Sequence, residues 1–190
     1  MSGRSCVGDV VNAVELLVGS GQPGGMTNLR RAAAHDEPFL RETLAAAADW
    51  RTPAAVRSGD EVMHDPVVAH YLAGWPLDGD FGVIADDAGV PVGAAWCRCF
   101  VSEPHGYGFV APDVSELTIG VVTERRGRGI GRLLLTEVIS EAQRRGIARI
   151  SLSVEADNLA IDLYIDVGFV EAFRIHDSPT MVIDVGANRT

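Results

Sequence analysis

The most chemically distinctive stretch of this sequence is a run of glycines and arginines in its second half. Residues 124–132 read Glu-Arg-Arg-Gly-Arg-Gly-Ile-Gly-Arg, so three alternate glycines and four arginines lie within nine positions. Glycines let a ligand approach the backbone closely and expose several N–H groups to it. The arginines add positive charge in a chain whose formal net charge is −10. The segment predicts a binding site for a polyanion such as a pyrophosphate, and the alternative is a glycine-rich turn with solvated arginines.

Two predicted elements would position this segment. Residues 116–122 read as a strand, and residues 129–145 carry apolar side chains at the one-face spacing of a helix, as at Ile130, Leu134 and Val138. A helix that begins at the end of the glycine run points the N–H groups of its first turn, and the positive end of its dipole, toward the same ligand. The order strand, loop, helix therefore supports the interpretation of an anion site.

Two common phosphate-binding loops fit the sequence poorly. A P-loop needs a lysine after its last glycine, and this chain contains no lysine. A dinucleotide fingerprint needs a third glycine where Arg132 stands, and residues 123–126 separate the glycines from the strand. Asp157 lies at a suitable distance downstream, so a nicotinamide-dependent oxidoreductase stays open as a weak alternative.

Together with a second motif, the loop resembles the signature of GNAT-type N-acetyltransferases, which bind acetyl-coenzyme A (acetyl-CoA). The first motif is Arg126-x-x-Gly129-x-Gly131 after a strand. The second resembles the family's strand-to-helix motif at Val154, Asn158, Ala160, Leu163, Tyr164, Gly168 and Phe169. The resemblance covers nearly the whole of residues 26–190. The sequence departs from it at Thr123, where members often carry proline, and at Gly120, which we expect to loosen side-chain packing on the central strand.

The resemblance implies a set of coenzyme-binding residues. Main-chain groups of Ile119 and Val121 would pair with the pantetheine arm like an added strand, because the central strands splay in this fold. Asn158 would contact a pantetheine amide, and it could equally be a plain helix N-cap. The backbone of the loop would wrap the pyrophosphate through Arg126, Gly127, Arg128, Gly129, Ile130, Gly131 and Arg132.

The resemblance also implies two catalytic residues, each with a structural alternative. Tyr164 matches the family's tyrosine that faces the coenzyme sulfur, where it would protonate the leaving thiolate; otherwise it is a core aromatic. Glu116 stands where some members carry a glutamate base, and it would take the proton of the amine directly or through water; otherwise it is an exposed sheet carboxylate. His105, in a loop rich in proline and glycine, is the rival base. No metal is implied.

The rest of the pattern predicts a single mixed α/β (α+β) domain, with flanking helices and a mostly antiparallel central sheet. The resemblance implies that the central strands of this sheet splay. Residues 1–25 read as a flexible extension that ends in a glycine-rich linker, with a short helix over residues 10–18 as the alternative, and residues 26–190 form the acetyltransferase-like domain. The expected strands are residues 28–34, 81–85, 91–100, 116–122, 150–154, 169–175 and 181–185, and the expected helices are residues 36–50, 60–72, 129–145 and 159–167.

Composition limits the class of protein. The 190 residues are 47% hydrophobic and 22% charged, as in an ordinary globular domain, and three cysteines are too few for a disulfide framework. No apolar run reaches the roughly 18 residues of a membrane span, and the negative charge argues against a nucleic-acid partner. We expect a cytoplasmic monomer or homodimer with no membrane partner.

The expected reaction is direct transfer of acetyl from acetyl-CoA to a primary amine, on a small molecule or a peptide. Seven carboxylates and no arginine or lysine lie between Arg57 and Arg98, which favours a cationic acceptor; the alternative is a solvated acidic surface. A non-catalytic acyl-CoA-binding module is the main alternative function.

Overall fold

The structure is a computed structural model, and it describes residues 27–52, 57–101 and 105–186. The predicted extension over residues 1–25, and the alternative helix within it, lie outside the described residues. No helix in the described ranges is both long and apolar enough to span a membrane.

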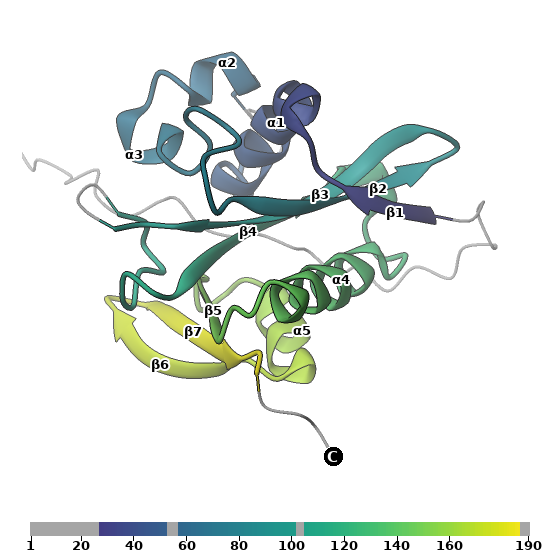
Figure 1. Cartoon of the computed structure of the whole chain (residues 1–190). Coiled ribbons are helices and arrows are strands. Elements are labelled where there is room, and N and C mark those ends of the chain that lie inside the picture. Colours follow the sequence, from purple (N-terminus) through teal and green to yellow (C-terminus); the bar gives the residue numbers. More distant parts are fainter. Residues whose placement is uncertain (1–26, 53–56, 102–104, 187–190) are drawn as a thin grey trace, which may run out of the picture.

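A seven-stranded sheet forms the centre of the molecule (Figure 1), with the strand order β1-β2-β3-β4-β5-β7-β6. Every neighbouring pair is antiparallel except β4 and β5, which are parallel. The predicted mixed, mostly antiparallel sheet is therefore confirmed. The strands are β1 (Thr27–Arg31), β2 (Phe81–Asp87), β3 (Val90–Cys99), β4 (Ser115–Val121), β5 (Arg149–Ser153), β6 (Val170–Ile175) and β7 (Ser178–Asp184).

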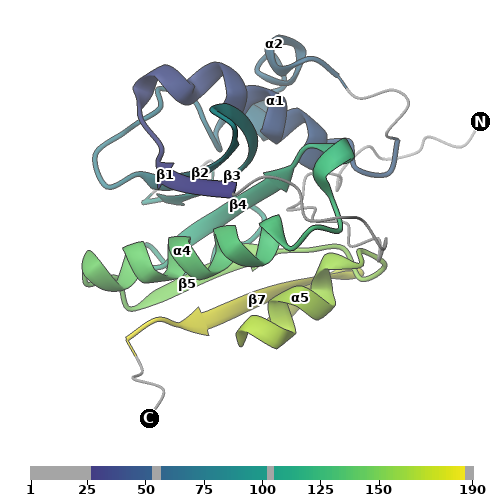
Figure 2. The same cartoon turned by 90° about the vertical axis from the view of Figure 1, so that its right-hand side faces the viewer.

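Helices cover both faces of this sheet (Figures 1 and 2). One face carries α1 (Glu37–Ala48), α2 (Gly59–Val62) and α3 (Pro66–Ala69), and the other carries α4 (Ile130–Arg144) and α5 (Ala160–Val167). Two 3-10 turns, η1 (Ala34–Asp36) and η3 (Thr123–Arg125), precede α1 and follow β4.

The strands feed two separate apolar cores because successive side chains point to opposite faces. Val83 and Cys97 pack in the layer with α4 and α5, whereas their chain neighbours Ile84 and Trp96 pack under α1 and α3. Burial on both faces explains why the central strands read as nearly continuous apolar runs in the sequence.

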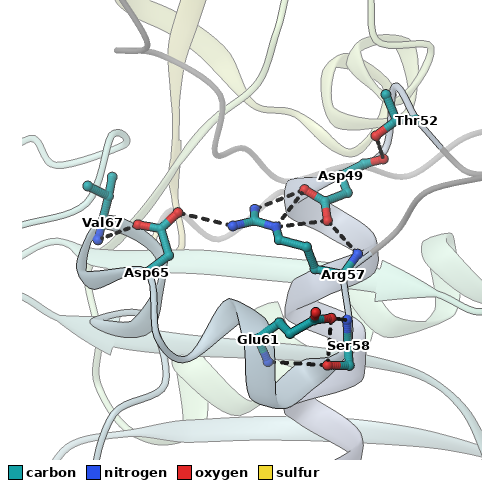
Figure 3. A network of polar contacts seen from close by, with 7 residues as sticks. All are labelled: Asp49, Thr52, Arg57, Ser58, Glu61, Asp65 and Val67. Atoms are coloured by element: carbon teal, nitrogen blue, oxygen red, sulfur yellow. Dashed lines mark hydrogen bonds and ion pairs between the residues drawn. The ribbon is translucent and has the colours of Figure 1, made fainter.

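The helix predicted over residues 60–72 is wrong, since the chain forms two short helices there instead. Pro66 has no N–H group to continue a helix, and the Asp65 carboxylate caps the new one by accepting the Val67 N–H at 3.0 Å. The Arg57 guanidinium then ties the end of α1 to this cap, through Asp49 at 2.9 Å and Asp65 at 3.1 Å (Figure 3).

The expectation that Gly120 loosens packing is also wrong. A Cβ atom at Gly120 would lie 2.7 Å from the Cγ2 atom of Thr43 on α1. The missing side chain therefore lets α1 approach β4 closely, and the packing at this point is tight.

The two halves of the sheet separate between β4 and β5. Their described pairs are Ser115 with Ile150 and Glu116 with Ser151, both at the start of β4. Beyond Glu116, β4 continues to Val121, and in this part it pairs only with β3 among the described strands. The divergence produces the splayed centre that the resemblance implied, and Figure 1 shows the two halves opening apart.

Candidate active site

The loop after β4 has the backbone that its glycines predicted. Gly127 and Gly129 adopt φ angles of +71° and +80°, in the left-handed region where other residues are strained. Gly129 is the N-cap of α4, and a Cβ atom there would meet nothing within 4 Å. The glycine is thus required by backbone conformation, and the space beside it is open to a ligand.

The arginines of this loop have different partners. Arg125 pairs with Asp87 at 2.7 Å and Arg132 pairs with Asp166 at 2.8 Å. The Arg126 Nε donates to the Val121 carbonyl at 3.1 Å, which ties the loop to the end of β4. Arg128 is exposed. The charge of the loop therefore serves partly to hold the loop in place, a role that the sequence did not reveal.

The other predicted coenzyme-binding residues lie on the elements that surround the opening. Ile119 and Val121 are on the diverging part of β4, with their side chains in the core, so only their main chain could serve a ligand. Ile130 is buried at the start of α4, and the same limit applies to it. The structure thus brings the predicted coenzyme-binding set to one end of the separating strands.

Asn158 is both a cap and an unsatisfied donor. Its Oδ1 atom accepts the Ala160 N–H at 2.9 Å at the start of α5. Its Nδ2 atom is buried and has no hydrogen-bond partner among the described residues. An unpaired buried donor is costly, so this amide fits a ligand carbonyl. The two sequence interpretations of Asn158 are compatible.

Glu116 is fully enclosed, with 2% of its surface exposed, so the alternative of an exposed sheet carboxylate is wrong. Its Oε1 atom accepts two hydrogen bonds, from the Tyr71 hydroxyl at 3.0 Å and from the Gly108 N–H at 2.7 Å. Its Oε2 atom is buried and lacks a partner in the described part of the chain. Burial raises the pKa of Glu116 to about 7, against the opposing effect of the two hydrogen bonds. A carboxyl with this pKa suits a general base near neutral pH.

Tyr164 is fully buried on α5, where its ring meets Phe169 edge-on at 5.9 Å. Burial raises the pKa of its hydroxyl far above the usual value, so the phenol keeps its proton at neutral pH. A retained proton suits a general acid and equally suits a core residue, so the catalytic role stays a prediction.

Three residues of the site were missed by sequence reasoning. Tyr71, in the turn after α3, carries no sequence signal. Gly106 and Gly108 flank Tyr107 in the described part of the loop between β3 and β4. Two glycines separated by one residue are a signal that the backbone of the loop passes close to another part of the protein. The rival base His105 lies in the same segment and stacks on Phe109, with ring centroids 4.1 Å apart.

The acidic run does not support a cationic acceptor. Glu61 caps α2, and most of the other carboxylates of the run are ion-paired within the protein. The pairs are Asp60–Arg41, Asp65–Arg57, Asp80–Arg98, Asp86–Arg30 and Asp87–Arg125. These carboxylates thus connect structural elements, a role that needs no ligand. Asp157, which suggested the dinucleotide alternative, pairs with Arg51 at 2.5 Å. Over the described ranges no three potential metal ligands gather into a group.

The fold and this site define a class of protein that comparison also identifies. The chain matches the Acetyltransferase (GNAT) family over residues 44–169, which include β4, the glycine-arginine loop and α5. The chain belongs to this family, and the resemblance stated from the two motifs is confirmed.

Individual relatives agree with this assignment. Mycothiol acetyltransferase of Amycolatopsis mediterranei is 29% identical over 136 residues, which are 70% of this chain and 42% of that protein. The structure of a putative acetyltransferase from Salmonella typhimurium with its cofactor acetyl-CoA has a TM-score of 0.62 and 25% identity, and the match covers 86% of this chain and 96% of that one. Ribosomal-protein-alanine N-acetyltransferase from Brucella melitensis has a TM-score of 0.60 and 26% identity, with 83% and 99% covered. The chain spans less than half the length of the curated relatives it matches.

Proposed function

We propose that this chain is an N-acetyltransferase that moves the acetyl group of acetyl-CoA directly to a primary amine. The observation that carries the proposal is the buried Asn158 amide, whose Nδ2 has no partner among the described residues. Asn158 follows β5 and the glycine loop follows β4, and these two strands are parallel, so both segments come after the same end of the β4–β5 pair. An extended ligand with amide groups at one end and phosphates at the other matches this arrangement. Family membership supports the same ligand and disfavours a dinucleotide.

The residues that would hold acetyl-CoA are those of the loop, the end of β4 and Asn158. The backbone of residues 126–132 would bind the pyrophosphate, the main chain of Ile119 and Val121 would pair with the pantetheine arm, and the Asn158 Nδ2 would donate to one of its carbonyls. When bound, acetyl-CoA supplies an acetyl group that is activated as a thioester.

The remaining chemistry belongs to the side chains of this protein. An amine is protonated near neutral pH and must lose a proton before it can attack a carbonyl. The Glu116 Oε2 atom would receive that proton, and a pKa of about 7 makes the carboxylate available under these conditions. The Tyr164 hydroxyl, which keeps its proton, would donate it to the leaving sulfur.

The acceptor is proposed only as a class. The relatives include a mycothiol acetyltransferase and a ribosomal-protein-alanine acetyltransferase, so the family likeness extends to small-molecule and protein acceptors alike. Because most carboxylates of the acidic run are ion-paired within the protein, the run does not by itself select a cationic amine. The proposal is therefore a primary amine of a small molecule or a peptide.

A two-part experiment tests this function. Acetyl-CoA and CoA should each raise the melting temperature, by an amount equivalent to about 2.7 kcal/mol at ~100 times the dissociation constant, while NAD should leave it unchanged. Release of free thiol over a panel of amines should then identify an acceptor. Stabilisation by NAD and not by CoA would contradict the ligand assignment. Stabilisation by CoA with no thiol release on any amine would instead favour a binding module.

A further inference from the structure

Tyr71 occupies a well-fixed position next to Glu116. Its main-chain carbonyl accepts the indole N–H of Trp96 on β3 at 3.1 Å. Its ring meets Phe100 edge-on at 5.8 Å and lies 4.4 Å from the ring of His70. A side chain held from both its backbone and its ring loses little entropy when its hydroxyl forms hydrogen bonds.

The Tyr71 hydroxyl links two parts of the site. It donates to the Glu116 Oε1 at 3.0 Å and accepts the main-chain N–H of Tyr107 at 2.7 Å. A phenol has one proton to donate, so the donation to Glu116 uses it completely. The same hydroxyl therefore holds the carboxylate and the covering segment in one chain of hydrogen bonds.

The covering segment, residues 105–109, lies directly on Glu116. A Cβ atom on Gly106 would stand 2.0 Å from the Glu116 Oε2. A Cβ atom on Gly108 would stand 2.8 Å from Oε1 and 2.7 Å from the Leu152 carbonyl carbon on β5. The segment thus spans β4 and β5 at the point where the two strands begin to separate, and only glycine permits the approach.

We propose that Tyr71 is the positioning residue of this site: its hydroxyl fixes Glu116 by Oε1, leaves Oε2 as the oxygen that takes a proton, and locks the covering segment over the carboxylate. The inference rests on the proposed function of Glu116 as the base. It implies that movement of the covering segment and ionisation of Glu116 are coupled, because both depend on one hydroxyl.

Among the residues that the structure describes, few other groups near Glu116 could produce the same effect. His70 lies beside Tyr71 in the turn, and His105 and Tyr107 lie on the covering segment. Arg98 faces Glu116 in the register from β3, but its guanidinium is held by Asp80 at 2.6 Å and by the His70 carbonyl at 2.7 Å. From β5, the neutral Ser151 lies opposite.

Tyr71→Phe tests the proposal in the full chain, without acetyl-CoA or acceptor. The protein is labelled with ¹³C at the glutamate carboxyl, and the signal that disappears in Glu116→Gln is titrated by NMR. Loss of a donor to the charged form should raise the pKa of Glu116 by about one pH unit or more. Hydrogen exchange at the Tyr107 and Gly108 amides should accelerate at least tenfold, since the segment loses its anchor.

Tyr107→Phe is the matched control, because it removes a phenol hydroxyl from the same region and keeps the amide that bonds Tyr71. It should leave the titration of Glu116 unchanged. As a second variant of unchanged shape, 3-fluorotyrosine at position 71 makes the phenol a stronger donor and should lower the pKa of Glu116. An unchanged titration in Tyr71→Phe, or an equal change in Tyr107→Phe, would overturn the proposal.

Failure of the inference and failure of the proposed function have different signatures. With an amine from the panel, Tyr71→Phe should shift the acidic limb of the pH profile of kcat/KM to higher pH. The shift should equal the change in pKa seen in the titration, and the KM for acetyl-CoA should stay unchanged. A changed titration with wild-type kinetics at every pH would support the coupling between Glu116 and the covering segment. It would also show that Tyr71 has no role in catalysis. No thiol release by the wild type would instead contradict the proposed function alone.

Discussion

Replacing Glu116 by glutamine should make the protein more stable at alkaline pH while it removes the proposed base. The carboxyl is fully enclosed, and one of its oxygens has no partner in the described part of the protein. The wild type therefore buries a poorly compensated charge whenever this group is ionised. Glutamine keeps the shape and an oxygen that accepts from Tyr71 and Gly108, and it carries no charge at any pH.

The magnitude follows from the ionisation of Glu116 in the two states. Burial raises the pKa of this carboxyl from the ordinary 4.5 to about 7 in the folded protein. Between these values the folded protein keeps a proton that the unfolded chain has released, so the stability contribution is full below about pH 4.5 and is lost as the pH rises to about 7. Integration between pH 5 and pH 8 gives a loss of about 2.5 kcal/mol for the wild type, which Glu116→Gln should not show.

Urea unfolding of both proteins at pH 5 and pH 8 measures this quantity. The free energy of unfolding of Glu116→Gln minus that of the wild type should increase by about 2.5 kcal/mol from pH 5 to pH 8. Any cost of the unpaired glutamine amide is the same at both pH values and cancels, as do all other titrating groups. A change below ~0.5 kcal/mol would show that Glu116 ionises like an exposed glutamate, and the reasoning on its burial would be refuted.

Three further predictions concern the coenzyme, the acid and the fold. Asn158→Ser keeps a capping oxygen and removes the buried amide, so it should weaken acetyl-CoA binding about tenfold with little loss of stability; equal affinity by calorimetry would remove Asn158 from the site. Tyr164→Phe should lower turnover about tenfold with nearly constant affinity for acetyl-CoA, and full turnover across a pH range would leave Tyr164 as a core residue. Arg98→Met leaves the buried Asp80 carboxylate without its partner and should cost about 3–5 kcal/mol in urea unfolding. The exposed pair Arg174–Glu171 provides the control, since Arg174→Met should leave the urea midpoint nearly unchanged.

The Glu116 prediction also explains why a polar cluster persists in an otherwise apolar region. Tyr71, Trp96 and Phe100 belong to the apolar core under α1 and α3, and an uncharged side chain at position 116 would complete that core. A buried carboxylate lowers stability at neutral pH, and in return it has a pKa near the pH at which an amine must be deprotonated. Under the proposed function, the buried carboxylate thus lowers stability and supplies the base.

Local features of the sequence were sufficient to predict the backbone of the glycine loop and the cap at Asn158. The left-handed glycines, the helix that begins at Gly129 and the cap at Asn158 all depend on residues near one another in the chain. Such features are encoded by backbone preferences and short-range hydrogen bonds, which a sequence displays directly. The alternation of apolar residues similarly predicted the strands and the antiparallel sheet.

The surroundings of Glu116, of the acidic run and of Gly120 were decided by tertiary structure alone. Glu116 is enclosed only once the chain has folded, and this burial raises its pKa to about 7. Tyr71 and Gly108, which lie 45 and 8 positions away in the chain, donate hydrogen bonds that oppose this rise. The pairing of the acidic run with arginines from other elements, and the close contact of Gly120 with Thr43, also depend on elements that meet only in the folded chain. Desolvation and charge pairing are set by what surrounds a group in space, so sequence spacing could identify Glu116 as a candidate but could not show that it is enclosed.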